Sequence, residues 1–366
     1  TLAQDVCKHA VATLVADRVQ GVFENLKVLV SHVINSCIVI LHARNTWDQS
    51  AQLKEYLRTV LMKKYDARFP AARPRRLRQT EWVRRLTREH RLSADDLIWA
   101  MVVHDGEESE IPVAAMPGTV RYSVKAAAAA ARKAAKLGIP AIAVFPHIDA
   151  AKKDSRGREA LNDKGLVCTA VRAMKDAAPE VGIMVDVALD PFTDHGHDGL
   201  LKNGRIVNDE TVKVLVEQAL VQVRAGADIV APSDMMDGRV GAIRAGLDKE
   251  GFADTLIMSY AAKYASAFYG PYREAIGSGK LGSGAVENPG DKKTYQMDFG
   301  NTDEAMREVA MDVGEGADML LVKPGLPYLD IVHRGKQTVG VPTDAVQVSG
   351  EYAVIVAAAQ NGWVDE

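Results

Sequence analysis

From residue 97 onward, short apolar runs rich in Val, Ile and Ala alternate with longer stretches of helical periodicity. The apolar runs lie at 97–104, 140–145, 182–189, 228–231, 256–260, 319–322 and 346–348. The helical stretches lie at 124–137, 164–178, 209–224, 241–250, 302–314 and 351–360. Strands that are apolar on both faces are typical of a parallel sheet covered by helices. The pattern predicts an α/β fold with seven β-units, one short of a closed (β/α)8 barrel, and a doubly wound open sheet is the alternative.

The residues before this alternation follow a different pattern. We divide the chain into an N-terminal extension of unknown role, an arm for subunit contact and a barrel domain, at 1–61, 62–95 and 96–366. Pro70 and Pro74 exclude one continuous helix across 68–78, because each proline removes a backbone donor and clashes with the preceding turn. A short helix is expected at 81–90.

Composition narrows the classes of function. The 366 residues carry a net charge of −3, which gives no reason to expect general affinity for nucleic acid or anionic membranes. Arginines concentrate only in the arm, at Arg68, Arg73, Arg75, Arg76, Arg78, Arg84, Arg85 and Arg88. We interpret them as a solvated or subunit-contacting surface, with polyanion binding as the alternative. The apolar stretch at 28–41 is too short to span a bilayer, and three scattered cysteines indicate a reducing cytoplasm.

Two lysines interrupt the apolar scheme where the strands are expected to end. Lys323 follows the run Met-Leu-Leu-Val, and Lys263 lies in Ser-Tyr-Ala-Ala-Lys-Tyr. Several aspartates and serines occupy similar strand-end positions, and in an α/β barrel all these ends open on one face. A lysine at the end of a core strand loses its proton more readily, and a neutral amine attacks a ketone to form an imine. The alternative is that each lysine snorkels to solvent or pairs with a strand-end aspartate.

Long, ordered motifs resemble the porphobilinogen synthase (5-aminolevulinate dehydratase) family. They begin at Arg73 (RPRRLR), Asp186 (DVALDPFTDHGHDG), Ala231 (APSDMMDGRV), Ser259 (SYAAKYASAFYGPYREA), Tyr295 (YQMD), Val322 (VKPGLPYLD) and Gln347 (QVSGEYA). The resemblance covers about four-fifths of the chain. It implies a TIM-type (β/α)8 barrel with an extended N-terminal arm. It also implies a lyase of tetrapyrrole biosynthesis that condenses two 5-aminolevulinate molecules to porphobilinogen with loss of two waters.

The resemblance also assigns roles to individual residues. Lys323 matches the lysine that binds the propionate-side substrate as a Schiff base, and Lys263 matches the acetate-side lysine. Arg273 matches an arginine for the acetate-side carboxylate. The segment from about 277 to 297 matches a mobile lid. Two further matches, Lys292 and Gln296, are carboxylate-binding positions of that lid.

Other matched positions surround the propionate-side substrate. Ser349 matches a hydroxyl that binds its carboxylate, and Asp186 and Ser233 match polar groups around its amine. Tyr272 occupies a pocket position where relatives often carry phenylalanine.

The metal requirement depends on the segment that follows Asp186. Zinc-dependent relatives have three cysteines where this chain has Ala188, Asp190 and Asp198. Thiolates suit zinc, so we expect no catalytic zinc and no organic cofactor. The two aspartates either bind a hard cation or contact the acetate-side amino group directly, and a metal site at His195 and His197 is a less favoured reading.

Magnesium remains open. Some relatives carry an allosteric, hydrated magnesium near a glutamate that Glu308 matches. An ordinary solvent-facing helix residue is the other interpretation of Glu308.

The arm resembles one that wraps a neighbouring subunit, which implies a homo-octamer or hexamer. The family chain continues some three dozen residues beyond Trp363, supplying the last β-unit and a carboxylate-binding tyrosine. We therefore expect either that this part exists in the natural protein or that the barrel is open and activity doubtful. The rival hypotheses are a class I aldolase, which needs one essential lysine, and a barrel that has lost its activity.

Overall fold

The computed structural model describes residues 68–278 and 289–365, which form parts of two units divided after His90. The predicted extension at 1–61 lies outside the described residues. In the first unit, the 3-10 helix η1 (Pro74–Arg78) is followed by α4 (Glu81–Thr87). As the two prolines predict, this stretch is not one helix. Its apolar side chains Phe69, Trp82 and Leu86 are exposed.

The second unit is built on a sheet whose main strands are parallel and follow one another in chain order. These strands are β1 (Ile98–His104), β4 (Ala141–Pro146), β5 (Gly182–Val187), β8 (Ile229–Pro232), β9 (Leu256–Lys263), β10 (Met319–Lys323) and β11 (Thr343–Ala345). The order never reverses, as it would in a doubly wound sheet, so the α/β barrel prediction is confirmed. Within the described residues β1 and β11 do not pair, and the barrel is not closed.

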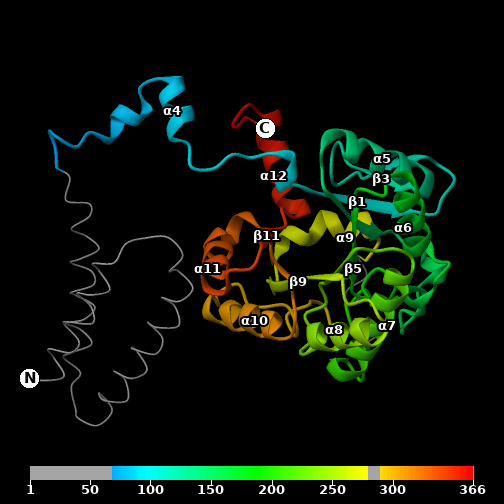
Figure 1. Ribbon diagram of the computed structural model, residues 1–366. Helices are drawn as coiled ribbons and strands as arrows, with labels where there is room; N and C mark the ends of the chain where they lie inside the picture. The colour runs from blue at the N-terminus through cyan, green and yellow to red at the C-terminus, as the bar shows by residue number, and fades with distance from the viewer. Residues whose placement is uncertain (1–67, 279–288, 366) are drawn as a thin grey trace, which may run out of the picture. The chain divides into compact units, whose positions relative to one another are not determined.

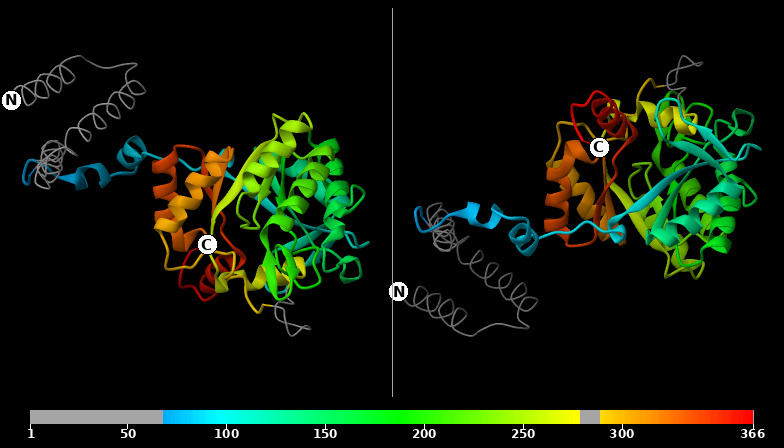
Figure 2. Two further views of the ribbon diagram at one scale, coloured as in Figure 1. Left: turned by 90° about the horizontal axis from the view of Figure 1, so that it is seen from below. Right: turned by 90° about the horizontal axis from the view of Figure 1, so that it is seen from above.

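Helices cover the outer face of this curved sheet (Figures 1 and 2). They are α5 (Val124–Leu137), α6 (Leu166–Ala177), α7 (Asn208–Arg224), α8 (Arg239–Lys249), α10 (Asp303–Gly314), α11 (Leu329–Val339) and α12 (Ser349–Gln360). Six of them lie within two residues of the predicted bounds at each end, and α11 was not predicted. None of the described helices is both long and apolar enough to cross a bilayer.

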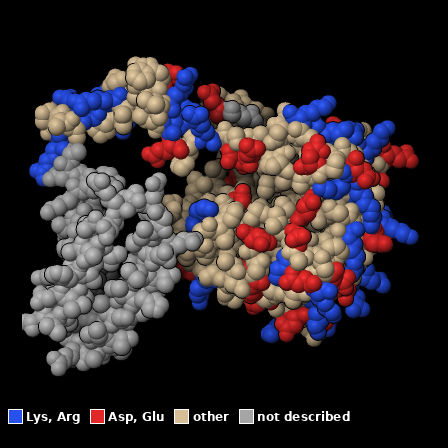
Figure 3. Space-filling model, in the orientation of Figure 1, with Lys and Arg blue, Asp and Glu red and all other residues tan. Residues whose placement is uncertain are grey.

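Shorter helices and strands lie between these elements. They are η2 (Ala94–Asp96), β2 (Glu110–Pro112), β3 (Val120–Ser123), η3 (Ala150–Lys152), η4 (Arg158–Leu161), β6 (Leu200–Lys202), β7 (Arg205–Val207), η5 (Ala267–Tyr269), α9 (Gly270–Ile276) and η6 (Leu326–Tyr328). β3 pairs with β1 in parallel and β2 pairs with β3 in antiparallel orientation, so both strands extend the sheet beyond β1. On the face drawn in Figure 3, acidic and basic residues are interspersed over the barrel unit.

The seventh predicted strand was placed wrongly. The apolar run 346–348 is not a strand, and β11 precedes it at Thr343–Ala345. β11 is a partly exposed edge strand with polar residues, so it lacks the apolar pattern by which buried strands are recognised.

The two faces of the sheet have separate cores. Ile183, Val185 and Val230 face outward and pack with residues of α5, α6 and α7 in the larger cluster. Alternate residues, such as Met184 and Ala231, face inward and form a second cluster of strand side chains. The inward set also contains Met258, Tyr260, Phe145 and Leu321. The inward face therefore forms the floor beneath the strand-end residues.

Two helix-to-strand turns repeat the same construction. Gly226 and Gly316 follow α7 and α10 with φ of +107° and +109°, a region that favours glycine. The next aspartates, Asp228 and Asp318, each accept a hydrogen bond of 2.8 Å from a backbone N–H at or near the start of the preceding strand. These turns hold the amino ends of the strands, away from the strand-end lysines.

Candidate active site

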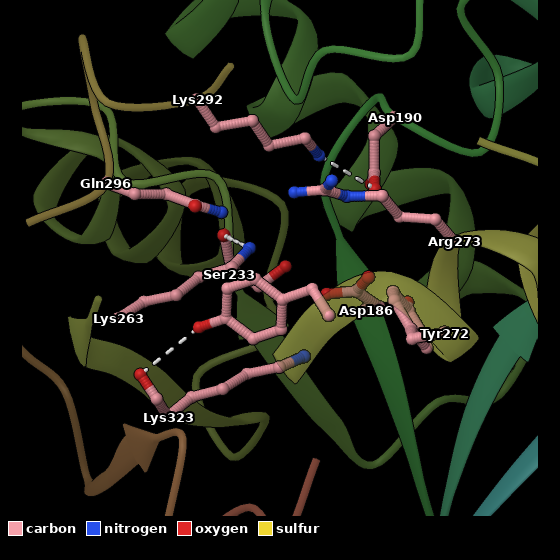
Figure 4. Close-up of a pocket in the computed structure, with 10 residues that line it drawn as sticks. Asp186, Asp190, Ser233, Lys263, Tyr272, Arg273, Lys292, Gln296 and Lys323 are labelled. Carbon is pink, nitrogen blue, oxygen red and sulfur yellow. Dashed lines mark hydrogen bonds and ion pairs between the residues drawn. The ribbon is translucent and has the colours of Figure 1, made fainter. Parts of the chain in front are cut away.

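The polar residues at the carboxyl ends of β5, β8, β9 and β10 line one pocket (Figure 4). Its lining consists of Asp186, Asp190, Ser233, Lys263, Tyr269, Tyr272, Arg273, Lys292, Gln296 and Lys323. Nine of these ten residues are sequence-predicted site residues. Residues more than 100 positions apart in the chain are thus brought together, because parallel strands end on the same face of the sheet.

Lys323 is buried without a polar partner. It lies opposite Lys263 in the β9–β10 register. Its Nζ makes no hydrogen bond or ion pair with the part of the chain that the structure describes, and lies 4.8–5.6 Å from the ring centres of Tyr260, Tyr269 and Tyr272. Burial, reinforced by the charge of Lys263, lowers the pKa of Lys323 to about 8. The aromatic rings favour the cation, but the effect of burial is larger.

Lys263 has the opposite environment. Its Nζ donates a hydrogen bond to the carbonyl of Ser233 and lies 3.3 Å from Oδ1 of Asp198. Both side chains of this ion pair are almost fully buried. The two lysines therefore stand side by side, one held by a carboxylate and the other surrounded by rings.

A third lysine lies between two carboxylates. Lys292 Nζ is 3.1 Å from Asp190 and 2.7 Å from Asp198. Burial disfavours its charge, but the two carboxylates raise the pKa of Lys292 above its usual value. Burial also disfavours the charge of Asp198, yet Lys263 and Lys292 hold the pKa of that carboxyl below its ordinary range. Asp198 is thus shared by both lysines, behind the pocket wall.

The environment of Asp186 favours the neutral form of its carboxyl group. Burial and the nearby charge of Asp190 raise the pKa of Asp186 to about 6. Its Oδ1 has no hydrogen-bond partner among the described residues. A carboxyl group with a pKa near neutrality can both donate and accept a proton at working pH.

Ser349 lies outside this pocket. Its Oγ accepts a hydrogen bond of 2.8 Å from Tyr272 N and donates one of 3.2 Å to Phe268 O. It lines an adjacent cavity, which also contains Lys323, Tyr272 and residues of β1. Lys323 therefore stands at the junction of two cavities.

Glu308 lies elsewhere, in a hollow together with Asp237 and Glu304. Burial raises the pKa of its carboxyl. Of the predicted lid, 279–288 lies outside the described residues, while Lys292 and Gln296 line the pocket.

At the predicted metal positions the two carboxylates already pair with an ammonium group. Ala188 is buried, and the lysine ammonium of residue 292 occupies the space between Asp190 and Asp198. His197 uses both ring nitrogens in contacts with Tyr295 and Pro289. In the described part of the chain, no group of three or more His, Cys, Asp or Glu is arranged to hold a metal.

Sequence reasoning missed several residues of the site. Tyr269 lines the pocket, and its hydroxyl donates to the carbonyls of Tyr264 and Lys323. The hydroxyl of Tyr295 accepts a hydrogen bond from Asp198 N and bonds to His197. These tyrosines lie inside the motifs quoted above, but nothing in their spacing distinguishes them from core aromatics.

Comparison with known proteins identifies the family. The family model for delta-aminolevulinic acid dehydratase matches residues 71–366. The chain belongs to this family. A delta-aminolevulinic acid dehydratase of Bradyrhizobium diazoefficiens is 60% identical over 81% of this chain and 82% of that protein. The enzyme of Rhodobacter capsulatus is 50% identical, over 81% and 88%. The resemblance drawn from the motifs is confirmed.

A solved structure agrees. The delta-aminolevulinic acid dehydratase (porphobilinogen synthase) of Toxoplasma gondii, in complex with the reaction product porphobilinogen, superposes with a TM-score of 0.77. The two sequences are 47% identical, and the match covers 80% of this chain and 82% of the Toxoplasma gondii chain. The dehydratase fold of that relative is therefore the fold of this chain.

We expect the dehydratase pocket to make Lys323 reactive near neutral pH. Its neutral fraction should rise about tenfold per pH unit up to about pH 8 and then level off, because its pKa is lowered to about 8. Competitive labelling of all lysines with a trace amine reagent, followed by peptide mass mapping, measures this profile. The exposed Lys293 serves as the internal reference. A midpoint for Lys323 above pH 10 would contradict the described environment.

Proposed function

We propose that this chain is a porphobilinogen synthase, which condenses two 5-aminolevulinate molecules to porphobilinogen with net loss of two waters. The observation that carries the proposal is the pair of buried lysines, Lys263 and Lys323, side by side in one pocket. Membership of the dehydratase family supports the same reaction. A class I aldolase needs only one such amine.

Lys323 forms the first Schiff base. Its neutral amine adds to the keto carbon of one 5-aminolevulinate, and the carbonyl oxygen leaves as water to give the imine. Asp186, with its pKa raised to about 6, exchanges protons during this step. Asp186 and Ser233 contact the amine of this propionate-side substrate. Ser349 binds its carboxylate in the adjacent cavity, with Tyr272 between the two cavities.

Lys263 binds the second substrate on the acetate side. Arg273, Gln296 and Lys292 line this part of the pocket and bind the substrate carboxylate. Asp190 and Asp198 receive its ammonium. Because Lys292 pairs with Asp190 and Asp198, a substrate that carries both charges can pair its carboxylate with Lys292 and its ammonium with the aspartates, so no buried charge is left unpaired.

The function is tested by removing the proposed nucleophile. Lys323→Ala should abolish porphobilinogen formation, because no other described amine at that strand end can form the propionate-side imine. Borohydride reduction in the presence of 5-aminolevulinate should label Lys323 in the parent protein, as read by mass mapping. More than a few percent of parental turnover in the variant would contradict the assignment of Lys323. If the protein keeps the fold but has lost its activity, Lys323 of the parent protein should stay unlabelled.

Lys292→Ala should raise the apparent KM for 5-aminolevulinate about ten- to a hundredfold. A charge-assisted hydrogen bond to a carboxylate contributes about 1.5–3 kcal/mol, and about 1.4 kcal/mol corresponds to tenfold. Trapping on Lys323 should continue, because the first substrate does not need Lys292. The neighbouring Lys293→Ala is the matched control: Lys293 is exposed, and its ammonium pairs with the exposed Asp291. Equal KM values in the two variants would refute the role of Lys292.

We propose that no catalytic zinc is required, because Ala188, Asp190 and Asp198 offer no thiolate. Carboxylate oxygens do suit a hard cation, and the hollow at Glu308, Asp237 and Glu304 fits a hydrated magnesium held largely through water. Zinc-selective chelators should therefore leave turnover intact. Stoichiometric zinc at the 186–198 segment, with activity lost on its removal, would overturn this.

We further propose that the arm contacts a neighbouring subunit in a homo-octamer or hexamer. Its exposed Phe69, Trp82 and Leu86 provide apolar surface suited to a partner. Deleting residues 68–90 should give smaller assemblies with weaker activity, as measured by sedimentation and turnover. A truncated protein that sediments like the parent and keeps full activity would contradict this role.

A further inference from the structure

Lys263 points into the barrel against the alternation of its own strand. Met258 and Tyr260 belong to the inward core, so regular alternation would turn residue 262 inward and residue 263 outward. Instead, Ala261 belongs to the outward core, Ala262 packs in a third cluster with Ala305 of α10, and Lys263 lines the pocket. Two successive outward residues mean that the strand changes phase just before the lysine.

The cause is one extra residue in β9. Leu320 of β10 pairs with Ser259, but Val322, two positions on, pairs with Ala262, three positions on. β10 keeps its alternation, with Leu321 inward and Lys323 inward. Without the extra residue, Lys323 would lie opposite Ala262. The bulge therefore places Lys263 opposite Lys323, which is the re-aiming of a side chain that bulges near active sites perform.

A buried guanidinium holds the bulged stretch from outside the barrel. Arg239, the first residue of α8, donates from Nη2 to Tyr260 O at 3.3 Å and to Ser259 Oγ at 3.2 Å. The same guanidinium makes a bidentate pair with Asp312 of α10, at 2.9 and 3.0 Å. Ser259 Oγ in turn donates to Asp312 at 2.6 Å. A bulge disrupts the ladder, and buried backbone groups then need other partners.

This network does not touch the pocket. Arg239 and Asp312 are both about 2% exposed, and neither lines the pocket. Replacing a buried ion pair by apolar residues of similar volume is often neutral or stabilising, so stability alone is a weak reason for a buried arginine here. The planar guanidinium of Arg239 holds its donors in a fixed geometry, which lets it bind the Asp312 carboxylate and the Tyr260 carbonyl at the same time.

We propose that Arg239 is a positioning residue for Lys263: with Asp312 and Ser259 it holds the β9 bulge that brings the second lysine beside the first. The inference rests on the proposed function, because it gives Lys263 a reactive role. Arg239 contacts neither substrate nor the reacting atoms. Its effect passes through the backbone of Tyr260 and the three residues that follow.

The test is Arg239→Lys, which keeps a charge for Asp312 but cannot bridge both Asp312 and the Tyr260 carbonyl. Turnover should fall roughly ten- to a hundredfold, the scale of a small misplacement of a reacting group. Borohydride trapping of 5-aminolevulinate on Lys323 should stay within about twofold of the parent protein, because β10 is not part of the bulge. Any adduct on Lys263 that the parent carries should decrease with turnover.

Arg244→Lys is the matched control. Arg244 lies on the same helix and also donates to two backbone carbonyls, those of Phe252 and Thr255, at the far end of β9. It should leave turnover and trapping unchanged. Parental turnover in Arg239→Lys would overturn the proposal. Parallel loss of turnover and Lys323 trapping would also overturn it, because that outcome indicates general disruption.

A second variant decides the matter if Arg239→Lys does not fold. Ser259→Ala keeps the Arg239–Asp312 pair and the bond to Tyr260 O but removes the two hydrogen bonds of Ser259 Oγ, so it should give the same split between turnover and trapping with smaller amplitude. An unchanged ratio would refute the positioning role. Failure of the proposed function looks different: the parent protein itself would form no porphobilinogen and no adduct on Lys323.

Discussion

The arrangement of the site follows from the free energy of burying two lysine amines next to each other. Each ammonium loses its hydration, and each disfavours the charge of the other. The pocket compensates only one of them: Lys263 has the Asp198 carboxylate and a backbone carbonyl, whereas Lys323 has tyrosine rings. Two chemically identical side chains thereby occupy different environments, as the proposed roles require of two identical substrates.

The same constraint governs the surrounding charges. Four cationic side chains surround the pocket together with three carboxyls: Lys263, Arg273, Lys292 and Lys323 with Asp186, Asp190 and Asp198. The compensation is arranged through Asp198, which contacts two of the lysines from behind the wall. The lysines and aspartates of the site form ion pairs with one another, and a zwitterionic substrate can replace such a pair with ion pairs of its own.

Much of this arrangement was predictable from the sequence, for identifiable reasons. Buried parallel strands are apolar on both faces, so a lysine such as Lys323 at a strand end stands out, and the long motifs carried most residues of the pocket. The edge strand β11 was missed because it is partly exposed and polar. The bulge was not foreseeable, since no residue type marks it. The Arg239–Asp312 pair joins residues 73 positions apart through tertiary packing alone.

The position of both lysines on β9 and β10 has a wider consequence. These neighbouring parallel strands are joined by a connection that includes α9 and α10, and Asp318 accepts a hydrogen bond from Ile257 N at the amino ends of the two strands. The spacing between the two amines is therefore set by the β9–β10 pairing and by the bulge that Arg239 and Asp312 contact. It does not depend on how the sheet is completed between β1 and β11. A change at that edge of the sheet therefore leaves the register that places Lys263 opposite Lys323 intact.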